Sequence, residues 1–390
     1  VTHIKRKLTM DNRKIKTAWL FQKYDGCSFF ASGVMEKLHS QNYSMTCIYL
    51  EKRSDAHNIL EDFGCRVIII GREGTTRLFN PFVLWRLSKF LRDNEIDVLH
   101  CHRHKATFYG SLAASIARTP VIISHVHGLK RTRTLLRRLV NHILYRIVGK
   151  VIVISESVRR DVLESNFQLS QAKVITIRNS IDFKKFDNAT ISRQEAREIL
   201  GLSENAFIFG TVGRLVPTKG HKYLISAFVK VWRTIPNAHL VVVGNGKLEA
   251  ELKEQAARLG CADAITFAGR RNDVPRLLRA FDVFVLSSIA EGLGVALLEA
   301  MAASLPCIAS TVGGIPEIIY NEELGYLVPP QDPDALSAAM IACYAAPEQD
   351  RRRMGEAASK MVEQLYSDDL YVEKLDKIYK EELIKNRNIN

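Results

Sequence analysis

Hydrophobic residues follow two alternating patterns along this chain from about residue 15 onward. Short runs rich in Val, Ile and Phe have the length of buried strands. Longer segments between them repeat apolar residues at helical spacing, as in residues 135–148 (LLRRLVNHILYRIV). This alternation predicts βαβ units and parallel sheets. The predicted strands are residues 15–21, 45–50, 66–70, 97–100, 120–124, 150–155 and 173–177 in a first series, and 207–212, 239–244, 265–269, 282–287, 306–310 and 325–329 in a second.

Polar residues 179–206 separate the two series and predict a linker with a short helix. A chain of 390 residues is also too long for one typical hydrophobic core. We therefore expect an α/β fold of two tandem, doubly wound, Rossmann-like domains, residues 1–185 and 186–368. The charged helical tail, residues 369–390, is expected to pack back on the first domain.

Composition narrows the class of protein. Hydrophobic residues make up 47% of the chain and charged residues 25%, as in ordinary globular domains. No apolar run reaches 18 residues, so no membrane-spanning helix is predicted. The basic first residues lack the apolar core of a secretory signal, and the start of translation, at Val1 or at Met10, stays open. The seven dispersed cysteines include no C-x-x-C, which predicts neither a disulfide framework nor a zinc site and fits the reducing cytoplasm.

The net charge of +13 is concentrated in the first half of the chain. Residues 1–185 hold 32 Lys and Arg against 15 Asp and Glu, a net charge of +17, whereas the remainder has a net charge of −4. This asymmetry predicts an anionic partner, either nucleic acid or an anionic membrane surface. Few aromatic residues accompany the basic ones for base stacking, so we expect no nucleic acid. We expect a peripheral location on the inner face of the cytoplasmic membrane. The alternative is that helix 135–148 packs its apolar face on the sheet and exposes only a solvated basic face.

Ligands of open α/β sheets bind beyond the carboxyl ends of the strands, where the run EGLGVALLEA begins at Glu291. Gly292 and Gly294 precede a predicted helix, whose first N–H groups favour a phosphate. Glu291 and Glu299 flank that helix start, and carboxylates accept hydrogen bonds from sugar hydroxyls. An isolated pair of this kind is more often two ordinary surface glutamates, but its surroundings favour a site for a nucleotide sugar.

A second loop, residues 213–220 (GRLVPTKG), follows the predicted strand 207–212. Arg214 can bind a diphosphate through two hydrogen bonds and Lys219 as a point charge. The loop is not a P-loop, because G-x4-G-K-[ST] is absent. Gly244 and Gly246 likewise lack the third glycine of a dinucleotide fingerprint.

Histidines end two strands of the first series. His102 follows the strand 97–100, and His127 follows the strand 120–124. Such histidines can bind a hydroxyl or a phosphate, although a lone histidine is more often an ordinary polar residue. Gly26 and Ser28, in the loop after the first strand, offer a further phosphate or sugar contact.

In order and spacing, these segments resemble glycosyltransferase family 4, whose members are retaining enzymes of the GT-B fold with two Rossmann-like domains facing a cleft. The resemblance covers residues 15–370 and is most specific over residues 207–330. The segments that carry it are VIVISESVRRDVL, IRNSID, GTVGRLVPTKG, VVVGNG, FAGRRNDVPRLL, EGLGVALLEAMAASLPCIASTVGGIPEII and a G-LVPP segment.

The resemblance implies a role for each residue. Arg214 and Lys219 would bind the donor diphosphate, Glu299 the ribose and Glu291 the transferred sugar. His127 would lie near the reacting centre and complete a catalytic set with Glu291, Arg214 and Lys219. The other implied donor contacts are Gly213, Gly244, Arg270, Gly292, Leu293, Gly294 and Val295, and Arg271 would lie near the base with Arg270. Gly26, Ser28 and His102 would form an acceptor or phosphate loop.

The implied reaction moves a hexosyl unit from a nucleoside diphosphate sugar to an acceptor hydroxyl with retention of configuration. The acceptor would be lipid-linked or a saccharide, in the assembly of bacterial lipopolysaccharide, capsule or exopolysaccharide. No metal or other cofactor is expected, because side-chain cations neutralise the leaving group. A non-transferring GT-B enzyme such as a UDP-sugar 2-epimerase is the alternative. The base of the donor (UDP, GDP or ADP), the sugar, the acceptor and the oligomeric state stay open.

Overall fold

The structure is a computed structural model that describes residues 13–24, 32–52, 58–76, 79–130, 134–187 and 191–387. The chain divides into two compact units. Unit 1 holds Val1–Ile154, Val158–Arg178 and Asp368–Asn390. Unit 2 holds Ser155–Ser157 and Asn179–Ser367.

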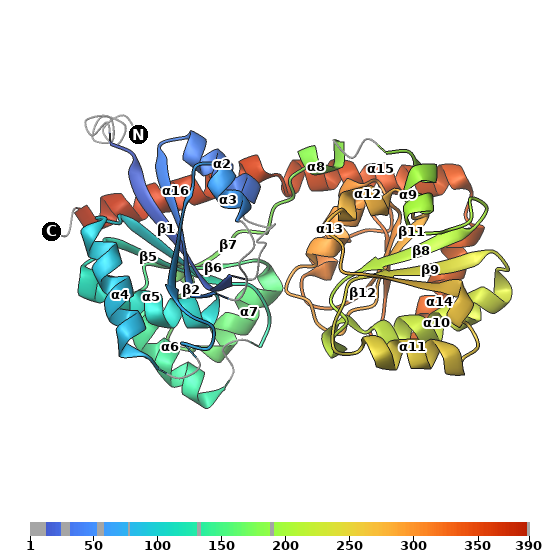
Figure 1. Cartoon of the computed structure of the whole chain (residues 1–390), viewed down its shortest axis with the longest axis horizontal. Helices are drawn as coiled ribbons and strands as arrows, with labels where there is room; N and C mark the ends of the chain where they lie inside the picture. The colour runs from blue at the N-terminus through green and yellow to red at the C-terminus, as the bar shows by residue number, and fades with distance from the viewer. Residues whose placement is uncertain are drawn as a thin grey trace. The chain divides into compact units, whose positions relative to one another are not determined.

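Unit 1 is built on a seven-stranded parallel sheet with the order β3-β2-β1-β4-β5-β6-β7 (Figure 1). The order reverses between β1 and β4, which is the place where doubly wound sheets bind ligands. The strands are β1 (Ile15–Tyr24), β2 (Tyr43–Lys52), β3 (Arg66–Gly71), β4 (Val98–His102), β5 (Val121–Val126), β6 (Lys150–Val153) and β7 (Val174–Thr176). The helices are α2 (Ser32–Ser40), α3 (Ile59–Asp62), α4 (Pro81–Asp93), α5 (Arg103–Ala117), α6 (Leu135–Ile147), α7 (Glu156–Ser165), the 3-10 turn η1 (Gln171–Lys173) and the C-terminal α16 (Asp368–Arg387).

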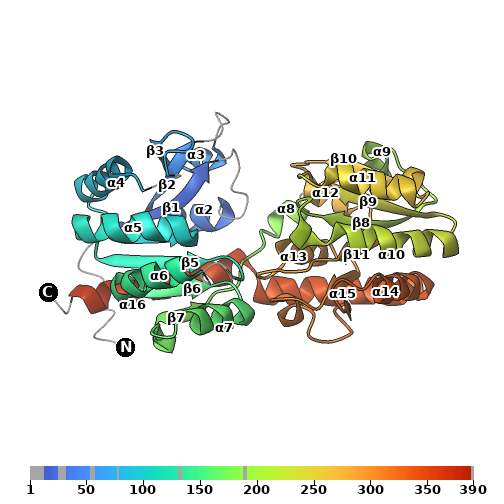
Figure 2. The ribbon, with the colours of Figure 1, turned by 90° about the horizontal axis from the view of Figure 1, so that it is seen from below.

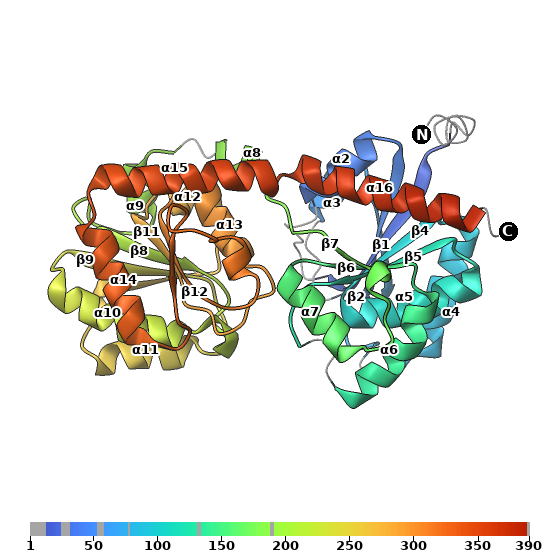
Figure 3. The ribbon, with the colours of Figure 1, turned by 180° about the vertical axis from the view of Figure 1, so that it is seen from behind.

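Helices cover both faces of this sheet. On one face α16 lies alongside α2, and their apolar side chains share a core with those of β1 (Figure 3). On the other face α4 packs beside α5, and α5 also contacts α6 (Figure 2). Because side chains alternate along a strand, Trp19 and His100 face α16, whereas Leu99 and Cys101 face Gly110 of α5.

Unit 2 repeats the plan with a six-stranded parallel sheet in the order β10-β9-β8-β11-β12-β13. Its strands are β8 (Phe207–Val212), β9 (Ala238–Val243), β10 (Ile265–Gly269), β11 (Val283–Leu286), β12 (Cys307–Ser310) and β13 (Tyr326–Val328). Its helices are α8 (Lys184–Asp187), α9 (Arg193–Ile199), α10 (His221–Thr234), α11 (Glu249–Arg258), α12 (Val274–Leu278), α13 (Val295–Ala302), α14 (Pro333–Ala345) and α15 (Glu348–Leu365). Short 3-10 turns are η2 (Pro217–Lys219), η3 (Ala262–Ala264) and η4 (Ile315–Glu317). Apolar residues of α10, α11 and α14 share one core with the sheet.

The predicted strands are all present, because continuous apolar runs are typical of strands buried on both faces. The largest difference at a single strand end is in β1, which continues past residue 21 to Tyr24, while β2 is two residues longer than predicted at each end. The described cysteines are free and buried: Cys47, Cys65, Cys101, Cys261, Cys307 and Cys343. Among the described residues, no helix combines the length and the apolar composition that crossing a bilayer requires.

Helix α6 does not pack its apolar face on the sheet, so that alternative was wrong. Leu135, Leu136, Leu139 and Ile143 are 60–74% exposed. Buried contacts come instead from Asn141, Leu144 and Tyr145.

Candidate functional site

Four loops at the carboxyl edge of the unit 2 sheet are held together by backbone hydrogen bonds. The Gly213 amide, after β8, donates to the Val243 carbonyl at 2.9 Å, and the Gly244 amide donates to the Gly269 carbonyl at 2.8 Å. The Ile289 amide, after β11, donates to the Thr218 carbonyl at 2.8 Å. These bonds fix the loop 213–220 against its neighbours before any ligand binds.

Glycine is required at two of these contacts. Gly220 has φ +66°, and a Cβ there would lie 2.0 Å from the Ser287 carbonyl oxygen. Gly244 has φ +138°, and a Cβ there would lie 1.9 Å from the Gly213 carbonyl oxygen. Both positions combine a left-handed backbone with close backbone approach, so no larger residue fits without a shift.

Lys219 and Glu291 form an ion pair between the loops after β8 and β11. Their side chains are 19% and 11% exposed. The pair is therefore mostly buried, but a ligand from the solvent can still contact it. The Ser288 hydroxyl donates to the same Glu291 oxygen, Oε1, at 2.7 Å. These contacts hold both side chains in place. They leave the second oxygen of Glu291 and two N–H donors of Lys219 for a ligand.

Helix α13 begins four residues after Glu291. Its N-cap Gly294 has φ +101°, and the helix starts at Val295. The first N–H groups have no acceptor inside the helix, so this end favours an anion. Leu293 is buried, so its side chain is not available to a ligand.

Glu299 lies one turn further along α13. Burial raises the pKa of its carboxyl from 4.5 to about 7, while the positive charges of Lys185 and Lys219 act in the opposite direction. Among the described residues, no hydrogen bond reaches this carboxylate. It is therefore a partly buried acceptor that a ligand hydroxyl can satisfy.

Arg214 and Arg270 are exposed, and within the described part of the chain neither guanidinium forms an ion pair. Arg271 differs, because its guanidinium donates to both oxygens of Asp273, at 2.8 and 2.7 Å. Of the two arginines expected near the base, only Arg270 is free of such a pair.

In unit 1 the structure brings His102 and His127 together. His102 ends β4 and His127 follows β5, and their atoms Nδ1 and Nε2 lie 3.0 Å apart. Burial, together with the nearby positive charge of Arg103, lowers the pKa of His127 to about 3, and burial lowers the pKa of His102 well below its usual value. Both rings are therefore neutral at pH 7. Gly26 and Ser28 lie outside the described residues.

The sequence did not single out Ser288 or Lys185. Ser288 lies at the start of the loop after β11 and donates a hydrogen bond to Glu291, and its position just beyond a buried strand was the available signal. Lys185 acts on Glu299 from α8, 114 residues away in sequence, and no spacing rule reaches that far.

Comparison with known proteins matches both units. Residues 192–361 match the family model described as glycosyl transferases group 1, and residues 26–185 match the model of Glycosyltransferase Family 4. One relative, the UDP-Gal:alpha-D-GlcNAc-diphosphoundecaprenol alpha-1,3-galactosyltransferase of Escherichia coli, is 32% identical over 65% of this chain and 68% of its own. The chain belongs to glycosyltransferase family 4.

Other relatives are similar over more of their length. The putative glycosyltransferase EpsD of Bacillus subtilis is 31% identical over 77% of this chain and 80% of its own. The phosphatidyl-myo-inositol mannosyltransferase of Mycobacterium tuberculosis is 29% identical over 73% of this chain and 74% of its own. The expectation of a glycosyltransferase is therefore confirmed.

Solved structures show the same fold. The Anabaena protein HepE, in complex with UDP and glucose, superposes with a TM-score of 0.81 at 21% identity and covers 94% of this chain and 100% of its own. The sucrose-phosphate synthase of Thermosynechococcus elongatus has a TM-score of 0.77 at 21% identity and covers 95% and 99%. The expected GT-B fold is confirmed.

Proposed function

We propose that this glycosyltransferase moves a hexosyl unit, with retention of anomeric configuration, from a nucleoside diphosphate sugar to a hydroxyl of a lipid-linked saccharide. UDP is the favoured nucleotide, because the Escherichia coli relative is named for UDP-Gal and the Anabaena structure holds UDP. The same relative is named for a diphosphoundecaprenol acceptor, which supports a lipid-linked acceptor and a role in surface polysaccharide assembly.

The observation that carries this proposal is the Lys219–Glu291 pair beside the N-terminus of α13. The diphosphate would bind Arg214, Lys219 and the first amides of α13, with Gly213 and Gly244 allowing close backbone approach. Glu299 would accept hydrogen bonds from the ribose, and Arg270 would lie near the base. Glu291 would hold the transferred sugar together with the amides of Gly292, Leu293, Gly294 and Val295.

Catalysis would then be mainly electrostatic. Negative charge develops on the leaving diphosphate as its bond to the sugar breaks, and Arg214, Lys219 and the helix N-terminus are placed to stabilise it. The Lys219 and Ser288 contacts hold Glu291 as a hydrogen-bond acceptor for sugar hydroxyls. We therefore favour attack by the acceptor hydroxyl on the same face, assisted by the leaving phosphate, with His127 near the reacting centre. Since side chains supply the positive charge, no metal ion is required.

Nucleotide-sugar binding tests the donor assignment. We expect UDP-hexoses to raise the melting temperature more than GDP- or ADP-hexoses, because a ligand of the folded state stabilises it in proportion to its affinity. Product analysis by NMR with a lipid-linked acceptor should then show retained configuration. Turnover of the donor that does not depend on acceptor would contradict transfer and favour the epimerase.

The same proposal includes docking on an anionic membrane through α6. The exposed face of this helix carries Leu135, Leu136, Leu139 and Ile143, and the helix contains Arg137, Arg138 and Arg146 but no acidic residue. Exposed apolar side chains beside arginines are typical of helices that lie in the plane of a membrane surface.

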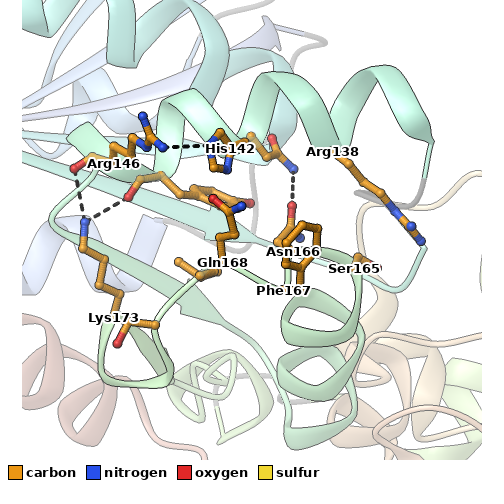
Figure 4. Close-up of a pocket in the computed structure, with 12 residues that line it drawn as sticks. Arg138, His142, Arg146, Ser165, Asn166, Phe167, Gln168 and Lys173 are labelled. Carbon is orange, nitrogen blue, oxygen red and sulfur yellow. Dashed lines mark hydrogen bonds between the residues drawn. The ribbon is translucent and has the colours of Figure 1, made fainter.

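A pocket of about 310 Å³ continues this surface between α6 and the segment that follows α7 (Figure 4). Arg138, Arg146 and Lys173 line it, and Phe167 beside them is 85% exposed. None of the described residues that line this pocket is acidic. Lys173 donates to carbonyls at the end of α6, and Asn141 bonds Asn166 at 3.2 Å, so the pocket has a fixed wall.

Vesicle binding tests the docking surface. We expect sedimentation with vesicles of phosphatidylcholine and phosphatidylglycerol that decreases with salt, because attraction to an anionic surface is about 1 kcal/mol per Lys or Arg and is screened. Arg137→Glu with Arg138→Glu should abolish it, whereas Arg233→Glu with Arg258→Glu, the same charge change on exposed residues of unit 2, should not. Transfer to a short soluble acceptor should survive both. Equal losses in the two double variants would refute docking through α6.

A further inference from the structure

Four histidines stack on the face of the unit 1 sheet that α16 covers. His100 and His102 come from β4, His125 from β5 and His127 from the loop after β5. The ring centroids of His100 and His102 are 4.5 Å apart, and those of His125 and His127 are 4.1 Å apart. His100 and His125 are fully buried, and His102 is 2% exposed. We call this set the histidine ladder.

Hydrogen bonds connect the ladder to α16. The indole Nε1–H of Trp19 donates to the Tyr379 hydroxyl oxygen at 3.0 Å. The same hydroxyl lies 2.5 Å from Nδ1 of His100. Nε2 of His100 in turn lies 3.2 Å from Nδ1 of His125.

The proton positions along this chain follow from its first member. An indole N–H can only donate, so the Tyr379 oxygen accepts from Trp19. Among the described residues, Nδ1 of His100 is the one acceptor that bonds the Tyr379 hydroxyl, so the hydroxyl proton goes to that nitrogen. Burial lowers the pKa of His100 to about 3 and that of His125 well below its usual value, so each ring is neutral and carries one proton. The His100 proton is therefore on Nε2 and is donated to His125 Nδ1. His125 in turn carries its proton on Nε2.

A metal ion is the other ligand chemistry that this cluster suggests, because His100, His102 and His125 offer atoms within 4.8 Å of one another. Both nitrogens of His100 are already hydrogen-bonded, to Tyr379 and to His125. A ligand set that includes His100 would break one of these bonds. The hydrogen-bonded ladder is thus the arrangement that the contacts favour.

We propose that Tyr379, on the C-terminal helix, is a positioning residue for glycosyl transfer that fixes the tautomers of His100 and His125 and thereby the ring of His127. Two contacts transmit the effect: His125 stacks on His127, and His102, which stacks on His100, bonds His127 at 3.0 Å. The proposal rests on the proposed place of His127 near the reacting centre. The tautomers themselves do not depend on that place.

Long-range ¹H–¹⁵N spectra of protein labelled with ¹⁵N-histidine test the tautomers directly. In the wild type, His100 and His125 should each show a proton on Nε2 alone. Tyr379→Phe removes the hydroxyl and leaves the two directions of the His100–His125 bond nearly equivalent, so both residues should show mixed tautomers. Trp19→Phe removes the N–H that donates to Tyr379 and should also give mixed tautomers. It replaces Tyr379→Phe in this test if that variant does not fold. A proton on Nδ1 of either histidine in the wild type would overturn the proposal.

Kinetics test the positioning role. Tyr379→Phe should lower kcat about fivefold, the equivalent of one hydrogen bond, with KM for the donor unchanged because the donor residues lie in unit 2. Tyr43→Phe is the matched control: its hydroxyl donates to Asp376 of the same helix at 2.8 Å and takes no part in the hydrogen bonds described above that join Trp19, Tyr379 and the ladder.

We expect the control to keep both the single tautomers and the wild-type kcat. Mixed tautomers with an unchanged kcat, or equal losses in the two tyrosine variants, would make the ladder a purely structural feature and overturn the positioning role. Failure of the proposed function is distinguishable, because the wild type itself would then show no acceptor-dependent transfer.

Discussion

Glu299→Gln tests the electrostatics of the donor site through stability alone. The unfolded chain ionises this carboxyl near pH 4.5, whereas the folded protein keeps it protonated until about pH 7. Between these values the folded state binds more protons than the unfolded state, so the free energy of unfolding falls as pH rises. Glutamine stays neutral and lacks this effect.

The size of the effect follows from the shift. One pKa unit corresponds to about 1.4 kcal/mol, so ionising Glu299 costs the folded state about 3 kcal/mol at pH 8. Most of this cost, about 2.5 kcal/mol, develops between pH 5 and pH 8. Relative to the wild type, Glu299→Gln should therefore gain about 2.5 kcal/mol over that interval.

Urea unfolding and calorimetry of the wild type and the variant at pH 5, 6, 7 and 8 measure this difference. All other titrating groups cancel when the two proteins are compared at the same pH. Glu251→Gln makes the same substitution at an exposed position on α11 and is the matched control for a glutamate that is not buried. A constant difference for Glu299→Gln would refute the inference that burial governs this carboxyl.

Three further predictions concern the donor loops. Arg214→Ala and Lys219→Ala should each lower kcat/KM by the equivalent of about 2–4 kcal/mol of transition-state stabilisation. The control Arg258→Ala, at an exposed position of α11, should leave kcat/KM unchanged. An unchanged kcat/KM in both Arg214→Ala and Lys219→Ala would refute the diphosphate assignment. Transfer should survive EDTA, since side chains supply the positive charge, and a strict requirement for Mn²⁺ or Mg²⁺ would contradict this. Gly220→Ala should lower the free energy of unfolding by about 1–3 kcal/mol more than Gly201→Ala. Both glycines have φ +66°, but only at Gly220 would the new Cβ lie 2.0 Å from a carbonyl oxygen, that of Ser287. Equal melting temperatures of the two variants would contradict this clash.

Local pattern determined much of this protein. Parallel strands are buried on both faces, so their continuous apolar runs were visible in the sequence and located each strand that the structure describes. The loops that follow them could be read in the same way, because ligand residues gather where parallel strands end. The segments around Arg214, Lys219 and Glu291 were therefore recognisable, and with them the family.

Contacts between distant residues were decided only by the tertiary structure. Lys219 and Glu291 are 72 positions apart, and nothing in either loop specifies their pairing or the part of Ser288. Trp19 and Tyr379 are 360 positions apart, and their bond exists because α16 returns to unit 1. Periodicity predicted an apolar face on α6, but whether a helix face is covered depends on what packs against it, and Leu135 and Leu136 are exposed. A sequence records which faces are apolar, whereas the pairing of charges and the direction of buried protons depend on which elements the folded chain brings together.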